Sequence, residues 1–135
     1  KGTHIYLHQG WCKGGLLSMV PVISNAALYW LDEAKRLVAE PEHSLIPQHL
    51  NYIQYRNSYD KQVRRAGIRH SHGLRHAYVQ ERYENLTGWK APVCGGPRKK
   101  QLTTEQRRID KEVRLTISEE IGHSRIAVTV NYLSA

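Results

Sequence analysis

The sequence is 135 residues long, with 20 lysine and arginine residues against 12 acidic residues and a net charge of +8 at pH 7. This length fits one domain, and the positive charge favours a polyanionic partner such as nucleic acid. No apolar run approaches the roughly 20 residues of a membrane-spanning helix, and no signal-peptide pattern opens the chain, so we expect a soluble, cytoplasmic protein. Cys12 and Cys94 lie outside any C-x-x-C pattern, which predicts free thiols and argues against a disulfide framework or a cysteine-based zinc site.

The chain opens with a pattern typical of a β-hairpin. Two short runs rich in β-branched or aromatic residues, 4–8 and 19–23, flank a stretch that contains Gly10, Gly14 and Gly15. Such runs separated by glycines predict two strands joined by a long turn. Proline cannot donate to a central strand, so Pro21 favours an edge strand.

Two helices are expected next. Ser24 can cap a helix that Pro41 stops, and a second helix is expected from about Gln48 to Ala66, ended by Gly67. Helical spacing of the apolar residues predicts which side chains face inward. These are Ala27, Leu28, Leu31, Ala34, Leu37 and Val38 in the first helix and Leu50, Ile53 and Val63 in the second.

A third helix is expected between Ser71 and Gly88. Its apolar face is predicted to consist of Leu74, Ala77, Tyr78 and Leu86. From Trp89 to Leu102 the chain collects proline, glycine and basic residues, a composition that breaks helices and predicts a loop.

The fourth helix has the clearest pattern. Thr103 and Gln106 have the spacing of a capping box, and Gly122 is placed to end the helix. Its apolar stripe consists of Ile109, Val113, Ile117 and Ile121. A last helical turn from Ser124 through Val130 is expected to deliver Tyr132 close to the end of the chain.

Two distant segments carry residue types suited to phosphate chemistry. His72 and Arg75 are three apart, so on a helix their side chains share a face and can converge on one anionic group. Arginine offers a planar donor fork for phosphate oxygens, and histidine can donate a hydrogen bond or transfer a proton near neutral pH. His123 directly follows Gly122, and Tyr132 lies beyond it. A phenol needs an electropositive site to become a nucleophile at neutral pH.

These segments resemble the motifs of tyrosine recombinases of the phage-integrase type. Residues 72–75 (His-Gly-Leu-Arg) resemble the His-x-x-Arg box of that family. Residues 121–126 (Ile-Gly-His-Ser-Arg-Ile), followed by Thr129 and Tyr132, resemble its Leu-Gly-His-Ser segment with the nucleophilic tyrosine at matching spacing. Residues 12–15, ahead of the second predicted strand, resemble the hairpin that carries a lysine in the family. The resemblance thus spans nearly the whole chain.

The resemblance implies a mostly α (α+β) catalytic domain with a small antiparallel β-hairpin at one edge. It implies a site-specific recombinase or integrase that cleaves and rejoins DNA through a 3′-phosphotyrosyl intermediate on Tyr132. Arg75 and His123 would stabilise charge on the phosphoryl oxygens, and His72 would assist proton transfer or orientation. Lys13 would protonate the leaving oxygen. No metal or cofactor is implied, and the partners implied are double-stranded DNA and, in a homo-tetramer, further copies of the enzyme.

The chain departs from the family pattern in three places. The family uses a further arginine on a helix before the hairpin, and that position would precede Lys1. We therefore expect residues 1–135 to form one partial catalytic domain, whose first arginine and DNA-binding region lie upstream. The interval between Arg75 and His123 is longer than usual, with the excess in the loop at 94–101, and we interpret it as an insertion. After Lys13 the chain continues with apolar residues where the family commonly has basic ones.

Six further basic residues are candidates for contacts with DNA phosphates, although charged residues of this kind often serve only to keep a surface solvated. Three precede the His-x-x-Arg box and three lie in the predicted loop. They are Arg64, Arg65, Arg69, Arg98, Lys99 and Lys100.

Other interpretations stay open. A type IB topoisomerase shares the tyrosine chemistry, and a DNA-binding module that kept the fold but lost catalysis would fit the missing arginine. Tyr132 taken alone is more often a packing aromatic than a nucleophile. His70, His72 and His76 are alternative zinc ligands, since His72 and His76 have the i, i+4 spacing of such ligands on a helix. No acidic residue lies between them and Arg75 beside them would repel a cation, so zinc is disfavoured.

Overall fold

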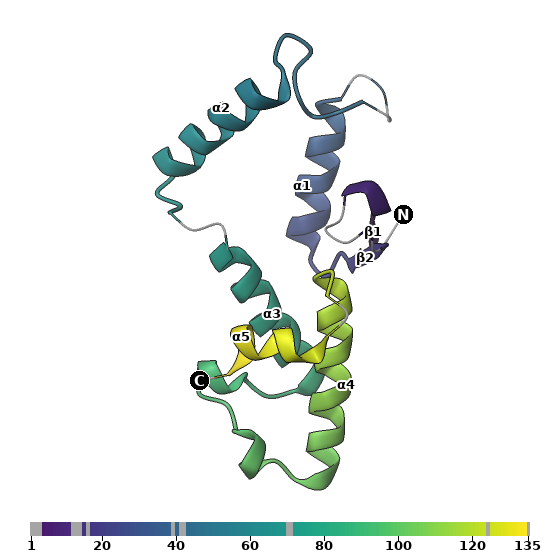
Figure 1. Ribbon diagram of the computed structural model, residues 1–135, viewed down its shortest axis with the longest axis vertical. Helices are drawn as coiled ribbons and strands as arrows, with labels where there is room; N and C mark the ends of the chain where they lie inside the picture. Colours follow the sequence, from purple (N-terminus) through teal and green to yellow (C-terminus); the bar gives the residue numbers. More distant parts are fainter. Residues whose placement is uncertain are drawn as a thin grey trace. The chain divides into compact units, whose positions relative to one another are not determined.

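The computed structural model describes residues 4–11, 15, 17–38, 40, 43–69, 72–123 and 125–134. These residues are mostly helical with one antiparallel pair of strands, which confirms the predicted class at that level (Figure 1). The chain divides into two compact units. The first is formed by Lys1–Pro21 with His72–Ala135, and the second by Val22–Ser71.

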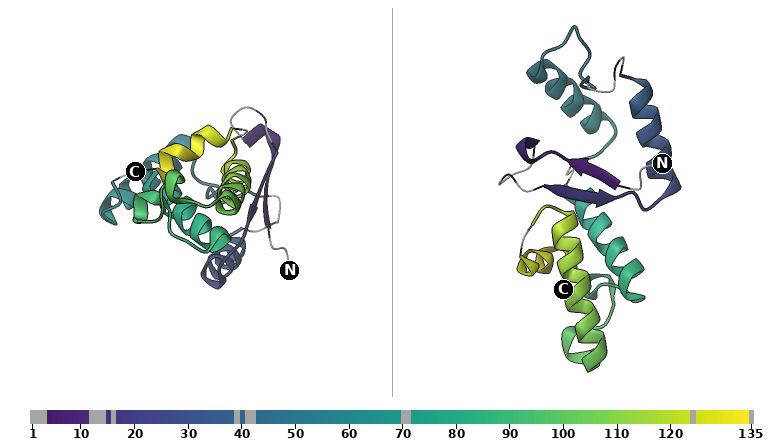
Figure 2. Two further views of the ribbon diagram at one scale, coloured as in Figure 1. Left: turned by 90° about the horizontal axis from the view of Figure 1, so that it is seen from below. Right: turned by 90° about the vertical axis from the view of Figure 1, so that its right-hand side faces the viewer.

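The hairpin of the first unit is confirmed. Strand β1, His4–Leu7, pairs antiparallel with β2, Ser18–Pro21, with Leu7 opposite Ser18 and His4 opposite Pro21 (Figure 2, right). Both strands of a two-stranded sheet are edge strands. Pro21, which has no backbone N–H, therefore does not cost the sheet a hydrogen bond to a further strand. Strand β2 also contacts α4.

Two long helices carry the core of the first unit. Helix α3, His72–Thr87, lies beside α4, Thr104–Glu120. The side chains of the buried apolar cluster come from both helices and from the segments that follow them. They are Val79, Tyr83, Ala91, Val113, Ile117, Ile121, Tyr132 and Leu133. The predicted stripe of α4 is confirmed for Val113, Ile117 and Ile121, and Ile109 packs against the cluster partly buried.

The predicted apolar face of α3 is wrong except for Tyr78, which packs partly buried against the core cluster. Leu74, Ala77 and Leu86 are exposed and Tyr78 is half-buried, whereas Val79 and Tyr83 are fully buried. Only these two apolar residues of α3 are buried, and polar side chains on the same helix make further contacts, Gln80 to α5 and Arg82 to α4. The spacing of apolar residues therefore gives little information about which face of this helix is buried.

Helix α4 begins and ends as predicted. Thr103 Oγ1 accepts from Gln106 N at 3.2 Å, and Gln106 Oε1 accepts from Thr103 N at 2.9 Å, which completes the capping box. At the other end Gly122 adopts φ 76°. Gly122 N donates to Glu119 O and His123 N donates to Ser118 O, the two hydrogen bonds of a Schellman motif.

The segments after α3 and α4 are short helical turns. The predicted loop contains two 3₁₀ turns, Pro92–Cys94 and Lys99–Gln101, and Cys94 is an exposed free thiol. The predicted final turn is confirmed as a 3₁₀ turn, Ile126–Thr129, continued by α5, Val130–Leu133. Helix α5 packs against α3.

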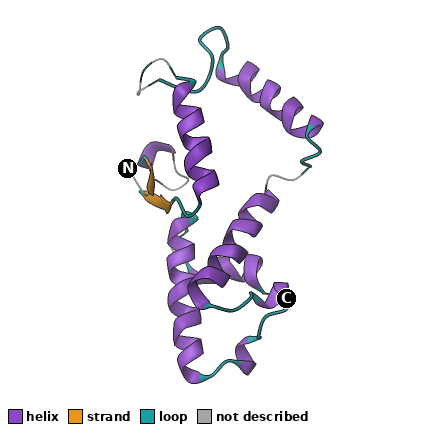
Figure 3. Ribbon diagram, turned by 180° about the vertical axis from the view of Figure 1, so that it is seen from behind, coloured by secondary structure: helices purple, strands orange, loops and turns teal. Residues whose placement is uncertain are grey.

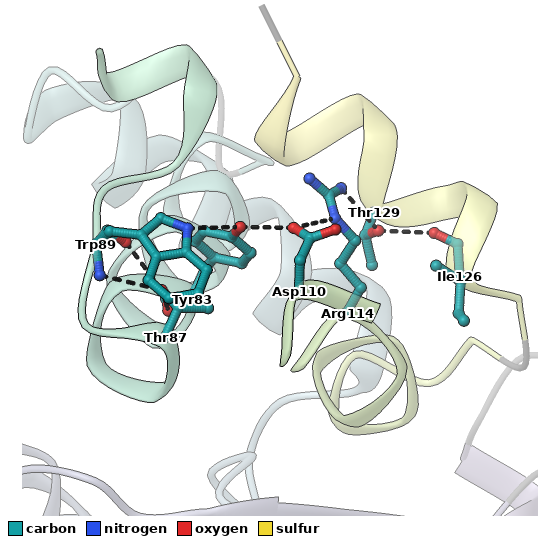
Figure 4. Close-up of polar contacts among 7 residues, drawn as sticks. All are labelled: Tyr83, Thr87, Trp89, Asp110, Arg114, Ile126 and Thr129. Carbon is teal, nitrogen blue, oxygen red and sulfur yellow. Dashed lines mark hydrogen bonds and ion pairs between the residues drawn. The ribbon is translucent and has the colours of Figure 1, made fainter. Parts of the chain in front are cut away.

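The buried carboxylate of Asp110 on α4 connects this helix to α3. Asp110 Oδ1 accepts from the Tyr83 hydroxyl at 2.6 Å and from Arg114 Nε at 2.9 Å (Figure 4). Trp89 Nε1 donates in turn to the Tyr83 hydroxyl at 3.2 Å. A buried charge is tolerated only when it is paired and hydrogen-bonded, and Asp110 meets both conditions.

We expect this network to make the first unit less stable at high pH. Burial, together with the hydrogen bond to Asp110, raises the pKa of Tyr83 from 10.0 to about 12. Above pH 10 the unfolded chain releases the phenolic proton while the folded chain keeps it, so the free energy of unfolding falls as the pH rises toward 12. Urea unfolding across this window measures the slope. Tyr83→Phe should reduce the slope but not abolish it, because the pKa of Tyr78 in the same unit is also raised. An undiminished slope in that variant would contradict the assignment.

The second unit contains the two helices predicted for it (Figure 3). Helix α1, Asn25–Arg36, is capped by Ser24, whose Oγ accepts from Ala27 N at 3.1 Å. Helix α2, Tyr52–Arg65, begins later than predicted because Asn51 and Gln54 form its capping box. Gly67 follows α2 with φ 76°.

The prediction that the apolar stripes of α1 and α2 face inward is wrong for several residues. Leu28, Leu37 and Ile53 are exposed, Leu37 by 80%. No side chain of α1 or α2, all of whose residues are described, is buried. An amphipathic stripe indicates which face of a helix could be buried, but another element has to cover that face.

Candidate functional site

A cavity of about 600 Å³ lies in the first unit, between the hairpin, the start of α3 and the end of α4. The residues lining it include Ser18, Leu74, Arg75, Tyr78, Glu120 and His123. Arg75 and His123 belong to separate motifs of the sequence, and the pairing of α3 with α4 brings them to one cavity. The Arg75 guanidinium has five N–H donors, and together with the His123 imidazole at the same cavity it is suited to bind an anionic group.

Arg75 is positioned by the end of α4. Its Nη1 donates a long hydrogen bond, 3.4 Å, to Ile121 O, which lies 46 residues further along the chain. The side chain is otherwise exposed, and its guanidinium makes no other hydrogen bond or ion pair with a described residue. Most of its donors therefore remain available to a bound anion.

His123 is positioned by the backbone turn that ends α4. Its N donates to Ser118 O at 2.8 Å, and its O accepts from Ser118 Oγ at 3.0 Å. Ser118 is fully buried and its Oγ also lies 3.0 Å from Arg125 O. A serine buried in the last turn of a helix thus holds both sides of the Gly-His turn, a role that the sequence does not indicate.

A carboxylate at one end of the cavity ties α3 to α4. Glu120 accepts from Arg82 Nη2 at 2.8 Å and from Arg82 Nε at 3.1 and 3.2 Å, and the Tyr78 hydroxyl donates to Glu120 Oε2 at 2.7 Å. Burial, and then the hydrogen bond to Glu120, raise the pKa of Tyr78 above its ordinary value. Tyr78 is therefore a neutral donor to Glu120. The sequence alone did not predict these contacts of Tyr78, Arg82 and Glu120. Arg82 and Glu120 are 38 residues apart, and no local pattern indicates that they pair.

Tyr132 lies in the core and not at the cavity of Arg75 and His123. It sits on α5 with 7% of its surface exposed, and it is not among the described residues that line the cavity. Its ring centroid is 4.7 Å from that of His76, and its backbone O accepts from Gln80 Nε2 at 3.1 Å. The structure therefore brings Arg75 and His123 together but leaves Tyr132 outside their cavity.

The other predicted site residues are dispersed. His72 is exposed in the first turn of α3, and Lys13 lies outside the described residues. Arg64, Arg65 and Arg69 are exposed in the second unit. In the first unit Arg98 and Lys99 line a second cavity, and Lys100 is exposed.

The described ranges contain no group of three or more histidine, cysteine, aspartate or glutamate side chains arranged to hold a metal ion. Within the same ranges, no helix combines the length and apolar character required to cross a membrane. Comparisons with known proteins found no matching family model, no matching curated protein and no matching solved structure.

Proposed function

We propose that this chain is the catalytic part of a tyrosine-type site-specific DNA recombinase, which cleaves and rejoins DNA through a 3′-phosphotyrosyl intermediate. The supporting observation is the cavity shared by Arg75 and His123. These residues come from two motifs that are far apart in the chain, and a phosphate-handling site requires such donors to converge on one point.

In this proposal the phenolic oxygen of Tyr132 attacks a DNA phosphorus in line. A bond forms between that oxygen and phosphorus, and the bond to the 5′ oxygen breaks. Arg75 and His123 stabilise the charge on the phosphoryl oxygens, and His72 assists proton transfer by accepting the phenolic proton of Tyr132. Lys13 supplies the proton that turns the leaving oxygen into a 5′-hydroxyl. Rejoining is the same sequence in reverse.

The reaction requires Tyr132 to move. Its ring is packed against His76 in the core, so the hydroxyl has to leave this position to reach a phosphate beside Arg75. Helix α5 is four residues long, and among the described residues the polar contact that joins Tyr132 to α3 is the hydrogen bond from Gln80 Nε2 to its backbone O. Displacing α5 therefore breaks few polar contacts of the described residues.

The exposed Arg64, Arg65 and Arg69 would contact DNA phosphates. The intact enzyme would work on double-stranded DNA as a homo-tetramer in the cytoplasm. Phosphate contacts of this kind release counterions, so binding should weaken steeply as salt rises.

The position of Tyr132 favours a second candidate function, a DNA-binding module of the same fold without catalysis. A nucleophile that is 7% exposed and packed in the core is not poised for attack. The two candidates share the cavity of Arg75 and His123 but differ in whether Tyr132 ever reaches it.

Trapping on a nicked suicide duplex distinguishes the two candidates. The nick lets the 5′-hydroxyl diffuse away, so a recombinase accumulates as a covalent adduct. The assay uses the full-length protein, and peptide mapping of the adduct should place the nucleotide on Tyr132. Salt-sensitive DNA binding without any adduct would support the non-catalytic module instead.

Replacing Arg75 by lysine tests the cavity itself. Lysine keeps the charge but loses the planar donor fork, so single-turnover cleavage should fall by about a hundredfold or more while the melting temperature changes little. Arg75 is exposed and forms no ion pair with a described residue, which is why the fold should tolerate the change. Unchanged cleavage, or a large loss of stability, would show that Arg75 does not bind the scissile phosphate.

A further inference from the structure

A second cavity, of about 570 Å³, lies in the first unit on a different part of α4. One wall is formed by Arg107, Asp110, Lys111 and Arg114, which share one face of the helix. The loop residues Pro92, Arg98 and Lys99 and residues of the segment 126–134 complete it. At 1.5 Å per residue, Lys111 is roughly 15 Å along the helix from Ile121, which lines the first cavity.

The charge of this cavity is strongly positive. Five cationic residues line it, Arg98, Lys99, Arg107, Lys111 and Arg114, against the single acid Asp110. Asp110 is already engaged by Tyr83 and by Arg114. The other four cations form no ion pair with a described residue, so four positive charges face one cavity without compensation.

The neighbouring residue Arg108 shows that α4 can neutralise its cations. Arg108 is paired with Glu105 at 2.6 Å and with Glu112 at 2.8 Å, and it does not line the cavity. Both glutamates therefore balance positive charge on the solvent-facing side of the helix. The cations on the cavity side are left for a ligand from outside the unit.

The apolar part of the lining restricts what that ligand can be. Pro92, Ile126, Ala127 and Val130 contribute apolar surface, and no aromatic residue is among the described lining residues. Nucleobases bind mainly by stacking on aromatic rings, which this lining does not offer. A DNA duplex is convex and presents phosphates and sugars, so it would leave the apolar surface inside a concave cavity unfilled. An apolar side chain flanked by carboxylates fits both the surface and the charge.

We propose that this cavity is a docking site for an acidic peptide segment of a partner protein, with an apolar side chain against Ile126, Ala127 and Val130 and carboxylates on Arg98, Lys99, Arg107 and Lys111. This goes beyond DNA recombination, and it assigns Arg98 and Lys99 to a protein partner instead of to DNA. Peptide binding here does not require Tyr132 chemistry, so either proposal can fail without the other.

The probe is a fluorescein-labelled peptide that alternates aspartate or glutamate with leucine, titrated against the protein by fluorescence anisotropy. Arg107→Gln with Lys111→Gln should weaken binding by about tenfold or more, because both lost cations face the ligand. Arg108→Gln with Lys90→Gln removes the same net charge outside the cavity, and it should change the dissociation constant by no more than about twofold. Replacing leucine by serine in the peptide should also weaken binding.

A second measurement uses the unaltered protein and so does not depend on how a variant folds. Acylation of lysines by an activated ester, read by mass spectrometry, should be slowed by the peptide at Lys99 and Lys111 and unchanged at Lys90, which is exposed in the same unit outside the cavity. Equal losses in the two double variants, or no protection of Lys99 and Lys111, would overturn the proposal. Protection of these two lysines by duplex DNA and not by the peptide would also overturn it, in favour of a nucleic-acid site.

Discussion

Replacing Tyr132 by phenylalanine should abolish the covalent protein–DNA adduct and leave folding and DNA affinity nearly intact. Only the hydroxyl can form the bond to phosphorus, so adduct formation should fall by at least about a thousandfold. The fold should tolerate the change, since the contacts of Tyr132 with other described residues involve its ring and its backbone oxygen. Trapping on the nicked duplex, with thermal melting of the same sample, measures both effects.

Tyr59→Phe is the matched control. Tyr59 lies on α2 in the second unit with 53% of its surface exposed, and it has no place in the proposed site. This variant should form the adduct at the rate of the unaltered protein. An adduct that persists in Tyr132→Phe would show that another residue is the nucleophile.

Replacing Glu120 by glutamine should destabilise the first unit by about 3 kcal/mol, because it leaves the partly buried guanidinium of Arg82 without its counter-charge. The side chains of Arg82 and Glu120 are 18% and 8% exposed. Solvent therefore does little to compensate for the lost charge. Glutamine offers one acceptor oxygen in place of two, so the Tyr78 hydroxyl and the Arg82 guanidinium compete for it. Urea unfolding gives the change in the free energy of unfolding.

Glu119→Gln is the matched control for Glu120→Gln. Glu119 neighbours Glu120 in the same helix and is exposed, so its loss should cost less than about 0.5 kcal/mol. Changing Arg82 and Glu120 together to methionine should recover much of the stability, because replacing both partners of a buried pair removes the uncompensated charge. Similar losses for Glu119→Gln and Glu120→Gln would contradict the role assigned to the buried pair.

The Glu120 pair also matters for the candidate site. Arg82 and Tyr78 lie on α3, and Glu120 is the last residue of α4, directly before Ile121, whose carbonyl accepts from Arg75. The pair therefore fixes α3 against the end of α4, where Arg75 and His123 meet. Glu120→Gln should accordingly lower cleavage by more than the loss of folded protein alone explains.

The sequence by itself determined the features that depend on neighbouring residues. Ser24, Thr103 with Gln106, and Gly122 begin or end helices through hydrogen bonds within a few residues, so composition and spacing predict them. The hairpin and the short turn that carries Tyr132 are local in the same sense. Even the start of α2 depends on a local capping box that includes Asn51, although its position was predicted too early.

Only the tertiary structure decided what those elements cover and which charges meet. The buried side of α3 is set by Val79 and Tyr83, because α4 packs there, and the charge of Glu120 is balanced by Arg82, 38 residues away. Whether Tyr132 lies at a cavity or in the core is likewise a matter of how α5 packs against α3. Burial and pairing energies arise between segments that are distant in the chain, and a local pattern holds no information about which distant segment will supply the contact.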